Sequence, residues 1–368
     1  MTGRRSKGRA TIADVAARAG VGAITVSRAL RDPAQVSERL RASIARAVRE
    51  LDYVPDLHAR ALASRQSSMV AVLIPAIAQN IFTDVLRGVY DGVEDSGLRI
   101  EIANTRYHPE VEERLVTELL RHRPAGVIIS GTGQSAATRR MLEGAGCPVV
   151  QIMDLTRDPI QKIIGFSHFD AGWRMTGHLI EQGYRRIAFV GGTMNGRSLG
   201  RLAGWRAALE AAGLYDPRLV GILGPMPEAP LPGPVMDHEF ANARMGRELT
   251  AGLLERFPDL DAVFCNTDVL AIGALFACMA RGIRVPEAFG IAGFNDFDYM
   301  EVAEPSLSSV RTHRWRCGNE AMLAVRALRG GAPVGEPVVD LGIEIMRRRS
   351  TDRTGEGGAR RGDFQAAR

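Results

Sequence analysis

A short segment near the N-terminus, residues 11–31, has the pattern of two helices joined by a tight turn. Thr11 can cap the first helix, and Asp14 at its third position suits the positive end of the helix dipole. Gly20 can end that helix, because glycine readily adopts the left-handed conformation that such a turn needs. The spacing of the apolar residues gives each helix one inward face, which predicts a helix-turn-helix.

The outward side of the second helix consists of small, polar and basic residues. Such a surface suits a helix whose N-terminal part enters the major groove of DNA. The alternative is an ordinary helical hairpin at the edge of a domain. The residues that we place on or near this outer side are Gly22, Ala23, Ile24, Thr25, Ser27, Arg28 and Arg31.

Charge is unevenly distributed along the 368 residues. Residues 1–68 carry a net charge of +7 and residues 347–368 a net charge of +4, so the residues between them carry −6 of the total of +5. A basic head on an acidic body indicates that the head alone meets a polyanion. Together with the helix-turn-helix, this favours DNA as the partner of the head.

The head, the linker and the tail can be delimited from composition. Ser37 can cap a third helix, whose apolar stripe Leu40, Ile44, Val48 and Leu51 would complete a small core. The linker favours helix but is too short to be stable alone, so it needs DNA or a second copy of the chain to order it. We predict a basic disordered arm at 1–10, the DNA-binding domain at 11–53, a hinge helix or linker at 54–68, and a disordered tail at 347–368.

From residue 69 to residue 346, short apolar runs alternate with amphipathic helices. Apolar strands that alternate with helices imply parallel, doubly wound α/β sheets. There are too many strands for one such sheet, so we predict two α/β lobes with a ligand-binding cleft between them. The predicted strands are 69–75, 99–104, 126–130, 148–153, 162–166, 186–192, 261–266 and 289–294.

Several classes of protein do not fit the composition. No apolar run approaches the roughly 18 residues of a membrane span, and no apolar stretch follows the basic N-terminus as in a secretory signal. The four cysteines lack metal-binding spacing and a disulfide pattern. We therefore expect a cytoplasmic protein associated with the nucleoid, with no membrane contact, no metal and no cofactor.

An α/β enzyme is a competing interpretation. The segments SGTGQS (130–135) and VGGTMNG (190–196) each follow a strand and could hold a phosphate at a helix N-terminus. Neither has the spacing of a P-loop or of a complete dinucleotide-binding motif. A sugar-binding protein of the transport type is a third class, and the basic head argues against it.

The residues of the helix-turn-helix, the following DYVP and the linker HARALASRQS resemble the lactose-repressor (LacI/GalR) family of bacterial transcription regulators. The resemblance continues through RLAGWRAAL (201–209), DAVFCNTDVLAIGAL (261–275) and FGIAGFNDFD (289–298), and so extends to about residue 345. Within the family, the chain looks most like the gluconate repressors. The resemblance implies a periplasmic-binding-protein-like core and a homodimer that binds a near-palindromic operator.

The resemblance also assigns roles in DNA binding. Ala23 and Ile24 occupy the positions that most often set operator choice, and their apolar side chains suit thymine methyl groups. Thr25 and Ser27 would bind phosphates, and Leu62 would wedge into the minor groove. The complete set of expected DNA contacts is Thr11, Gly22, Ala23, Ile24, Thr25, Ser27, Arg28, Arg31, Ala59, Arg60 and Leu62.

The effector site follows in the same way. Arg201 and Asp268 match a ligand-binding arginine and aspartate, and Arg197 would add a second cation for an acidic ligand. A solvated loop is the alternative for both arginines, and a helix cap is the alternative for Asp268. The expected effector residues are Ile81, Phe82, Phe166, Arg197, Arg201, Asp268 and Asn295.

Two departures qualify the resemblance. The Pro- and Gly-rich loop at 224–237 is longer than expected for the gluconate repressors, so another sugar acid, a neutral sugar or another metabolite stays open as the effector. The tail has no leucine heptads, so we expect a dimer rather than a tetramer.

Overall fold

The computed structural model of the chain describes residues 10–31, 33–53, 67–192, 194–222 and 241–353. The chain divides into two compact units, Met1–Gln66 and Ser67–Arg368. The linker at 54–66 and the loop at 224–237 lie outside the described residues, as does the arm up to residue 9. Each unit is treated separately below.

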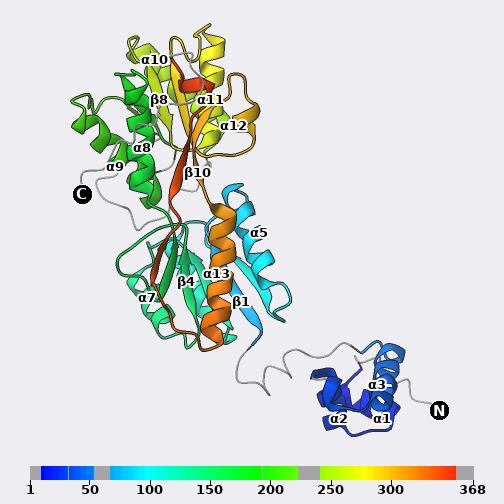
Figure 1. The fold of residues 1–368 in the computed structure, drawn as a ribbon. Helices are drawn as coiled ribbons and strands as arrows, with labels where there is room; N and C mark the ends of the chain where they lie inside the picture. The colour runs from blue at the N-terminus through cyan, green and yellow to red at the C-terminus, as the bar shows by residue number, and fades with distance from the viewer. Residues whose placement is uncertain (1–9, 32, 54–66, 193, 223–240, 354–368) are drawn as a thin grey trace, which may run out of the picture. The chain divides into compact units, whose positions relative to one another are not determined.

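The first unit is a bundle of three helices around a small core (Figure 1). Thr11 and Asp14 form a capping box, in which the Asp14 amide donates to Thr11 Oγ1 at 3.3 Å and the Thr11 amide donates to Asp14 Oδ2 at 2.8 Å. Gly20 ends the first helix with φ of +68°. The elements are α1 (Ile12–Ala19), α2 (Ala23–Arg31), a 3₁₀ turn (Pro33–Gln35) and α3 (Glu38–Glu50).

The third helix differs from its prediction in two details. Ser37 precedes α3, but its side chain makes no capping hydrogen bond. Leu40 is 36% exposed rather than inward-facing, whereas Val36, from the turn before α3, is buried in the core. At this end the core therefore uses Val36, two residues before the helix, together with Ile44 and Ala47 from α3.

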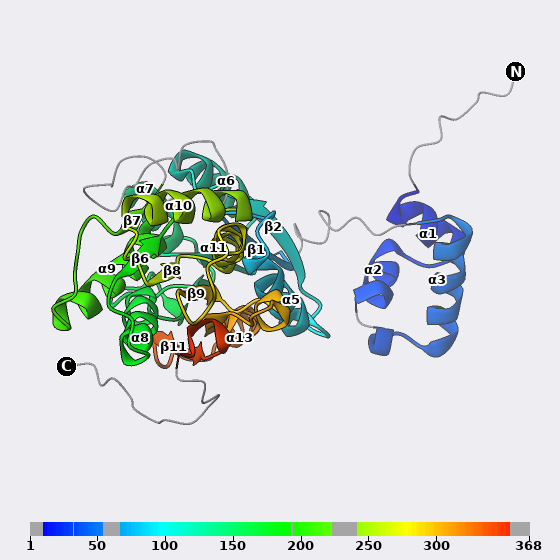
Figure 2. The same ribbon diagram turned by 90° about the horizontal axis from the view of Figure 1, so that it is seen from above.

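The second unit consists of two α/β lobes, as predicted, each with a six-stranded sheet. Figure 1 and Figure 2 show the lobes with their helices packed against the sheets. The N-terminal lobe has the strand order β11-β5-β4-β3-β1-β2. Its elements are β1 (Met69–Ile74), α5 (Ile81–Val93), β2 (Arg99–Asn104), α6 (Pro109–Arg121), β3 (Gly126–Ser130), α7 (Ala136–Glu143), β4 (Val149–Ile152), β5 (Lys162–Gly165), α13 (Arg314–Arg329) and β11 (Val338–Asp340).

The C-terminal lobe has the strand order β12-β10-β9-β8-β6-β7, and only β12 pairs antiparallel to its neighbour, β10. All eight predicted strands are present, whereas β7, β10, β11 and β12 were not predicted because they are short or polar. The elements are α8 (His168–Glu181), β6 (Ile187–Val190), α9 (Gly196–Ala211), β7 (Val220–Gly221), α10 (Ala243–Arg256), β8 (Ala262–Cys265), α11 (Asp268–Ala280), β9 (Gly290–Asn295), α12 (Tyr299–Val302), β10 (Ser308–Thr312) and β12 (Ile343–Met346).

The chain passes between the lobes three times, after β5, after β10 and after β11.

Strand β1 shows how each sheet is covered on both sides. Val70 and Val72 belong to the large core that includes residues of α5 and α13, whereas Ala71 and Leu73 face a second core with residues of α6 and α7. Buried side chains on both faces explain why the strands read as continuous apolar runs.

Two glycines bring α8 and α9 into close contact. A Cβ on Gly172 would lie 2.1 Å from the carbonyl oxygen of Arg201, and a Cβ on Gly204 would lie 2.0 Å from that of Phe169. Any side chain at either position would push the helices apart. The glycines therefore fix the backbone of Arg201 against α8, next to the cleft.

The predicted start of the disordered tail, residue 347, is wrong. Residues 347–353 pack on the C-terminal lobe and include a 3₁₀ turn, Arg349–Thr351. Ser350 Oγ donates to the Ile291 carbonyl oxygen at 2.6 Å, and Thr351 Oγ1 lies 2.8 Å from His178 Nε2. The segment lacks apolar periodicity because hydrogen bonds from small polar side chains hold it, which a hydrophobic pattern does not reveal.

His178 should make stability depend on pH. Burial lowers the pKa of His178 to about 4 from a model-peptide value near 6.5. Between these values the unfolded chain binds a proton that the folded protein does not, so stability falls as the pH falls. We expect the free energy of urea unfolding to drop by about 2–3 kcal/mol more in the wild type than in His178→Gln between pH 7.5 and pH 4.5. Parallel pH profiles would contradict this account.

Candidate DNA-binding surface and effector pocket

The described residues of α2 present the side chains expected to face DNA. Gly22, Ala23, Ser27 and Arg28 are exposed and Thr25 is half-buried, while Val26 and Ala29 of the same helix lie in the core. Ile24 is 77% exposed, so its apolar side chain is available for a contact outside this unit. This arrangement leaves one face of α2 free for a base-reading role.

The remaining expected DNA contacts are less informative. Thr11 is exposed but its hydroxyl is already engaged in the capping box of α1. Arg31 is the last residue of α2. Ala59, Arg60 and Leu62 lie outside the described residues, so their roles stay predictions.

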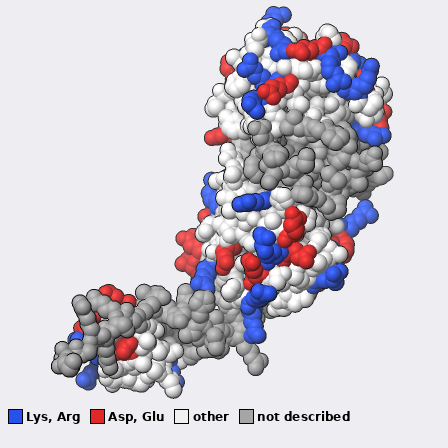
Figure 3. All heavy atoms as spheres, turned by 180° about the vertical axis from the view of Figure 1, so that it is seen from behind, with Lys and Arg blue, Asp and Glu red and all other residues white. Residues whose placement is uncertain are grey.

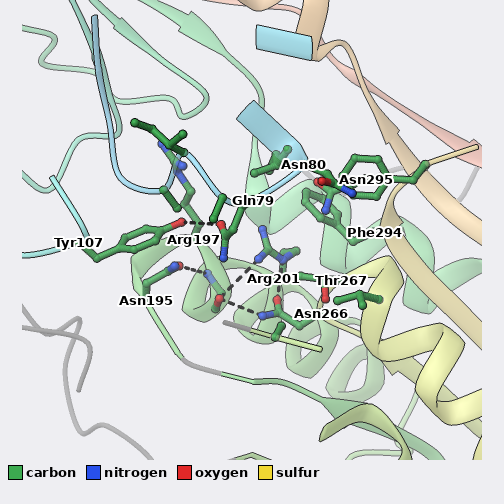
Figure 4. A pocket seen from close by; sticks show the side chains of 18 of the residues that line it. Gln79, Asn80, Tyr107, Asn195, Arg197, Arg201, Asn266, Thr267, Phe294 and Asn295 are labelled. Carbon is green, nitrogen blue, oxygen red and sulfur yellow. Dashed lines mark hydrogen bonds between the residues drawn. The ribbon is translucent and has the colours of Figure 1, made fainter. Parts of the chain in front are cut away.

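A cavity of about 670 Å³ lies between the two lobes of the second unit. Figure 4 shows its polar side chains, which come from both lobes. The N-terminal lobe contributes the loop after β1, the start of α5 and the loop after β2, and the C-terminal lobe contributes the ends of β6, β8 and β9 with the helices that follow. The lining residues are Ala76, Ile77, Ala78, Gln79, Asn80, Ile81, Asn104, Arg106, Tyr107, His108, His168, Asn195, Arg197, Ser198, Arg201, Ala241, Asn266, Thr267, Val269, Ile272, Phe294, Asn295, Phe297 and Tyr299.

Arg201 lies at the centre of the polar part of the cavity. Its Nε donates to Asn266 Oδ1 at 2.6 Å, and its Nη1 donates to His168 Nδ1 at 2.7 Å. The guanidinium also lies 4.2 Å above the ring of Phe294. Burial, and then the charge of Arg197, lower the pKa of Arg201 to about 9, so the side chain is still positively charged at neutral pH.

His168 holds Arg201 as a neutral acceptor. Burial, together with the charges of Arg201 and Arg197, lowers the pKa of His168 well below 6.5. Because an arginine can only donate, Nδ1 of His168 must accept, and its Nε2 then donates to the carbonyl oxygen of Met153 at 3.1 Å. The imidazole therefore links the pocket arginine to the N-terminal lobe.

Arg197 reaches from α9 across to the N-terminal lobe. Its Nη2 donates to Ser130 Oγ at 2.8 Å, and its Nε lies 3.8 Å from Asp154 Oδ2. Burial raises the pKa of Asp154, and the nearby Arg197 opposes that rise. Arg197 is thus a second cation in the cavity wall, and the solvated-loop alternative holds for neither arginine, because both are largely buried.

The expected effector residues fall into two groups. Ile81, Arg197, Arg201 and Asn295 line the cavity. Phe82, Phe166 and Asp268 are buried behind its wall and are not among the lining residues.

Asp268 differs most from its expected role. Its carboxylate accepts hydrogen bonds from Ser309 Oγ at 2.6 Å and from the Phe297 amide at 2.8 Å. Both oxygens therefore face the interior of the lobe, where they hold the loop after β9. The helix-cap alternative is also wrong, because the N-cap of α11 is Thr267.

The sequence interpretation missed most of the amide side chains of the cavity, including Asn266 and Asn80, as well as His168. Asn266 directly follows β8. It lies in a segment that resembles the family, but the resemblance assigned no role to this residue. A polar residue directly after a buried strand was the available signal, since ligands of α/β lobes bind at the carboxyl ends of strands.

The charge of the cavity wall is one-sided. Among the described lining residues, three are arginines and none is an aspartate or a glutamate. Figure 3 shows that acidic and basic side chains are intermixed on the outer face of the second unit that it draws. The described residues also contain no group of acidic, histidine and cysteine side chains that could hold a metal ion.

A helix-turn-helix unit followed by a two-lobed body with an internal cavity defines a class of ligand-controlled DNA-binding regulators. The family model described as "Bacterial regulatory proteins, lacI family" matches residues 11–56. The model described as "Periplasmic binding protein-like domain" matches residues 176–351. No helix in the described part of the chain is long and apolar enough to cross a membrane.

Relatives cover almost the whole chain. The transcriptional regulator GntR of Pseudomonas aeruginosa is 40% identical over 347 residues, which are 94% of this chain and 97% of the relative. A LacI family regulator from Silicibacter pomeroyi has a crystal structure that is 34% identical, with a TM-score of 0.83 over 94% of this chain and all of that one. The structure of GntR from Chromobacterium violaceum is 37% identical, with a TM-score of 0.70 over 77% of this chain and 99% of that one.

The chain therefore belongs to the LacI family of bacterial transcriptional regulators. It is a DNA-binding transcriptional repressor of this family and not an enzyme. In the two glycine-containing segments that raised the enzyme alternative, Gly131 leaves room for the guanidinium of Arg197, and Asn195 caps α9 and lines the cavity.

Ile24 provides a test of the DNA-facing surface. We expect Ile24→Ala to weaken binding to a duplex selected by the wild-type protein from a randomised pool by about tenfold, because an apolar contact with a thymine methyl group is lost. Binding to unselected DNA should not change, since phosphate contacts remain. Fluorescence anisotropy measures both affinities. Leu40→Ala, an exposed leucine on α3, is the control, and equal losses in the two variants would show that α2 has no special role.

Proposed function

We propose that this repressor is controlled by a sugar acid of the gluconate type, bound between the two lobes. The observation that carries the proposal is the cavity wall with three arginines and no carboxylate among its described residues. A cavity of this charge favours an anion over a neutral molecule. The resemblance to the gluconate repressors and the relatives named GntR support the same class of ligand.

The ligand carboxylate would bind next to Arg201 and Arg197. A guanidinium has five N–H donors, and the contacts of Arg201 with Asn266 and His168 use two of them. A third contact, with Ser198 Oγ, is long at 3.5 Å. Donors therefore remain for a carboxylate, which an arginine can bind with two parallel hydrogen bonds.

The hydroxyl groups of the ligand would bind the amide and hydroxyl side chains of the wall. Asn295 Oδ1 and Thr267 Oγ1 are buried and have no hydrogen-bond partner among the described residues. Buried polar atoms are normally satisfied, so these two positions support a ligand that donates hydrogen bonds. The lining also includes the side-chain amides of Gln79, Asn80, Asn104, Asn195 and Asn266.

Regulation in this proposal requires a homodimer. Two copies would place two α2 helices in successive half-sites of a near-palindromic operator, with Leu62 of each linker in the minor groove. Exposed apolar side chains on α5 and α11, namely Tyr90, Phe276 and Met279, support self-association. Sugar-acid binding would weaken DNA binding through a coupling free energy of about 1–3 kcal/mol.

A neutral sugar is the second candidate, because part of the cavity wall is apolar. Ile77, Ile81, Val269 and Ile272 line the cavity and offer no hydrogen bonds from their side chains. Such a surface suits the apolar faces of a sugar ring. The two candidates differ in their dependence on the arginines.

Arg201 separates the candidates. We expect Arg201→Ala to lower the affinity for D-gluconate at least 100-fold, because the principal cation and its planar fork are lost. Affinity for the selected duplex in the absence of D-gluconate should stay within about threefold, since the arginine lies in the other unit. Isothermal titration calorimetry and anisotropy measure the two quantities.

Two further variants serve as controls for Arg201→Ala. Arg206→Ala removes an exposed arginine from the same helix, where it pairs with Glu210 at 2.7 Å, and should leave both affinities unchanged. Arg201→Lys keeps the charge in case the alanine variant does not fold. Loss of DNA binding together with ligand binding in a folded variant would contradict the site assignment.

A further inference from the structure

Asn295 has an unusual conformation at the end of β9. Its φ is +120°, in a region that favours glycine, and the next residue, Asp296, also has a positive φ of +58°. The residue is 4% exposed and lines the cavity (Figure 4), and its Oδ1 is buried with no partner among the described residues. Strain of this kind persists only where surrounding groups enforce it, and it is frequent at ligand sites.

Arg314 contacts the backbone of Asn295 directly. Its Nη1 donates to the carbonyl oxygen of Asn295, and the same nitrogen lies 3.3 Å from Thr312 Oγ1. Its guanidinium also lies 4.6 Å above the ring of Phe297, which lines the cavity. Arg314 is 8% exposed and is not itself a lining residue, so it acts on the cavity only through its neighbours.

The other side of Arg314 is bound to the N-terminal lobe. Its Nε and Nη2 both donate to Asp84 Oδ2, at 3.1 Å and 2.9 Å. Asp84 lies on α5, one turn after Asn80, which lines the cavity from the opposite lobe. One guanidinium thus connects the strained asparagine of one lobe to the first turn of a helix in the other.

Helices α5 and α13 form a tightly packed pair. A Cβ on Gly88 of α5 would lie 2.0 Å from the Trp315 carbonyl oxygen, and a Cβ on Gly318 of α13 would lie 1.9 Å from that of Val85. Arg326 Nη1 donates to the Gly92 carbonyl oxygen at 2.8 Å near the far end of the pair. The backbones are in contact, so a shift at the first turn of α5 is shared by both helices.

We propose that Arg314 is the positioning residue of the effector site. It holds Asn295 in the conformation that presents Oδ1 to a hydroxyl group of the ligand, and its ion pair with Asp84 ties that conformation to the α5–α13 pair. The affinity of the cavity then depends on a residue that never touches the ligand. This inference rests on the proposed function, because it assumes a polyhydroxy ligand in the cavity.

A double-mutant cycle on Arg314 and Asn295 tests the proposal, with D-gluconate as the probe and calorimetry as the measurement. We expect Arg314→Lys and Asn295→Ala each to raise the Kd about tenfold, since each removes the same hydrogen bond to the ligand. The double variant should also show about a tenfold rise, because Arg314 acts through Asn295. Full additivity, a rise of about a hundredfold, would contradict the proposal.

Arg326→Lys is the matched control. It weakens an arginine-to-carbonyl link between the same two helices, far from Asn295, and should change the Kd less than twofold while lowering the thermal midpoint about as much as Arg314→Lys does. An equal loss of affinity in Arg326→Lys would show that Arg314 only stabilises the helix pair. An unchanged Kd in Arg314→Lys would also overturn the proposal.

The link to α5 has its own pair of variants. Asp84→Asn should raise the Kd several-fold in the wild-type background and have no effect in the Asn295→Ala background. Asp91→Asn weakens a comparable bond between the helices, which Asp91 Oδ2 accepts from Trp315 Nε1 at 2.7 Å, because a neutral amide oxygen replaces a carboxylate. This substitution should have no effect in either background. Equal effects of the two substitutions would contradict the proposed connection.

Failure of the proposed function would be recognised separately. A wild-type protein that binds D-glucose but not D-gluconate contradicts the sugar-acid proposal, and the same cycle measured with D-glucose then decides the role of Arg314. A wild-type protein that binds neither sugar contradicts both proposals.

Discussion

The cavity between the lobes depends on one buried positive charge, the guanidinium of Arg201. Removing such a group from water is unfavourable unless acceptors and a polarisable surface replace the lost hydration. Asn266, a neutral His168 and the ring of Phe294 supply them. None of these partners carries a negative charge, and the described cavity wall adds none. The guanidinium of Arg201 therefore has acceptors but no direct ion pair, since the nearby carboxylate of Asp154 lies against Arg197 at 3.8 Å, and an anionic ligand could supply that pair.

The rest of the second unit places this charge between the two lobes. Glycines on α8 and α9 bring the backbone of Arg201 against α8, while Arg197 and His168 extend from the C-terminal lobe to Ser130 and the Met153 carbonyl of the other lobe. The polar contacts of the cavity thus coincide with contacts between the lobes. A ligand that binds the arginines necessarily acts on the same groups that set the relation of one lobe to the other, which is what a regulated repressor requires.

Much of the fold was predictable from the sequence, because apolar strands that alternate with helices leave few architectures. The lining of the candidate effector cavity was only partly predictable. Arg197 and Arg201 line the cavity, whereas Phe82, Phe166 and Asp268 are buried and are not among its lining residues. Position along the chain does not show which side of a wall a side chain faces, since successive residues of a strand or of a helix point in different directions. The polar strand β10 and the segment up to Arg353 escaped prediction because hydrogen bonds, not apolar periodicity, hold them.

The central claim is that the cavity selects an anionic sugar, and a thermal-shift comparison of D-gluconate with D-glucose on the full-length wild-type protein tests it most directly. A ligand at about 100 times its Kd stabilises the folded state by about 2.7 kcal/mol, which gives a readable shift of the melting temperature. The account predicts a clear shift with D-gluconate and little or none with D-glucose at the same concentration. A shift with D-glucose that equals or exceeds the shift with D-gluconate would contradict it.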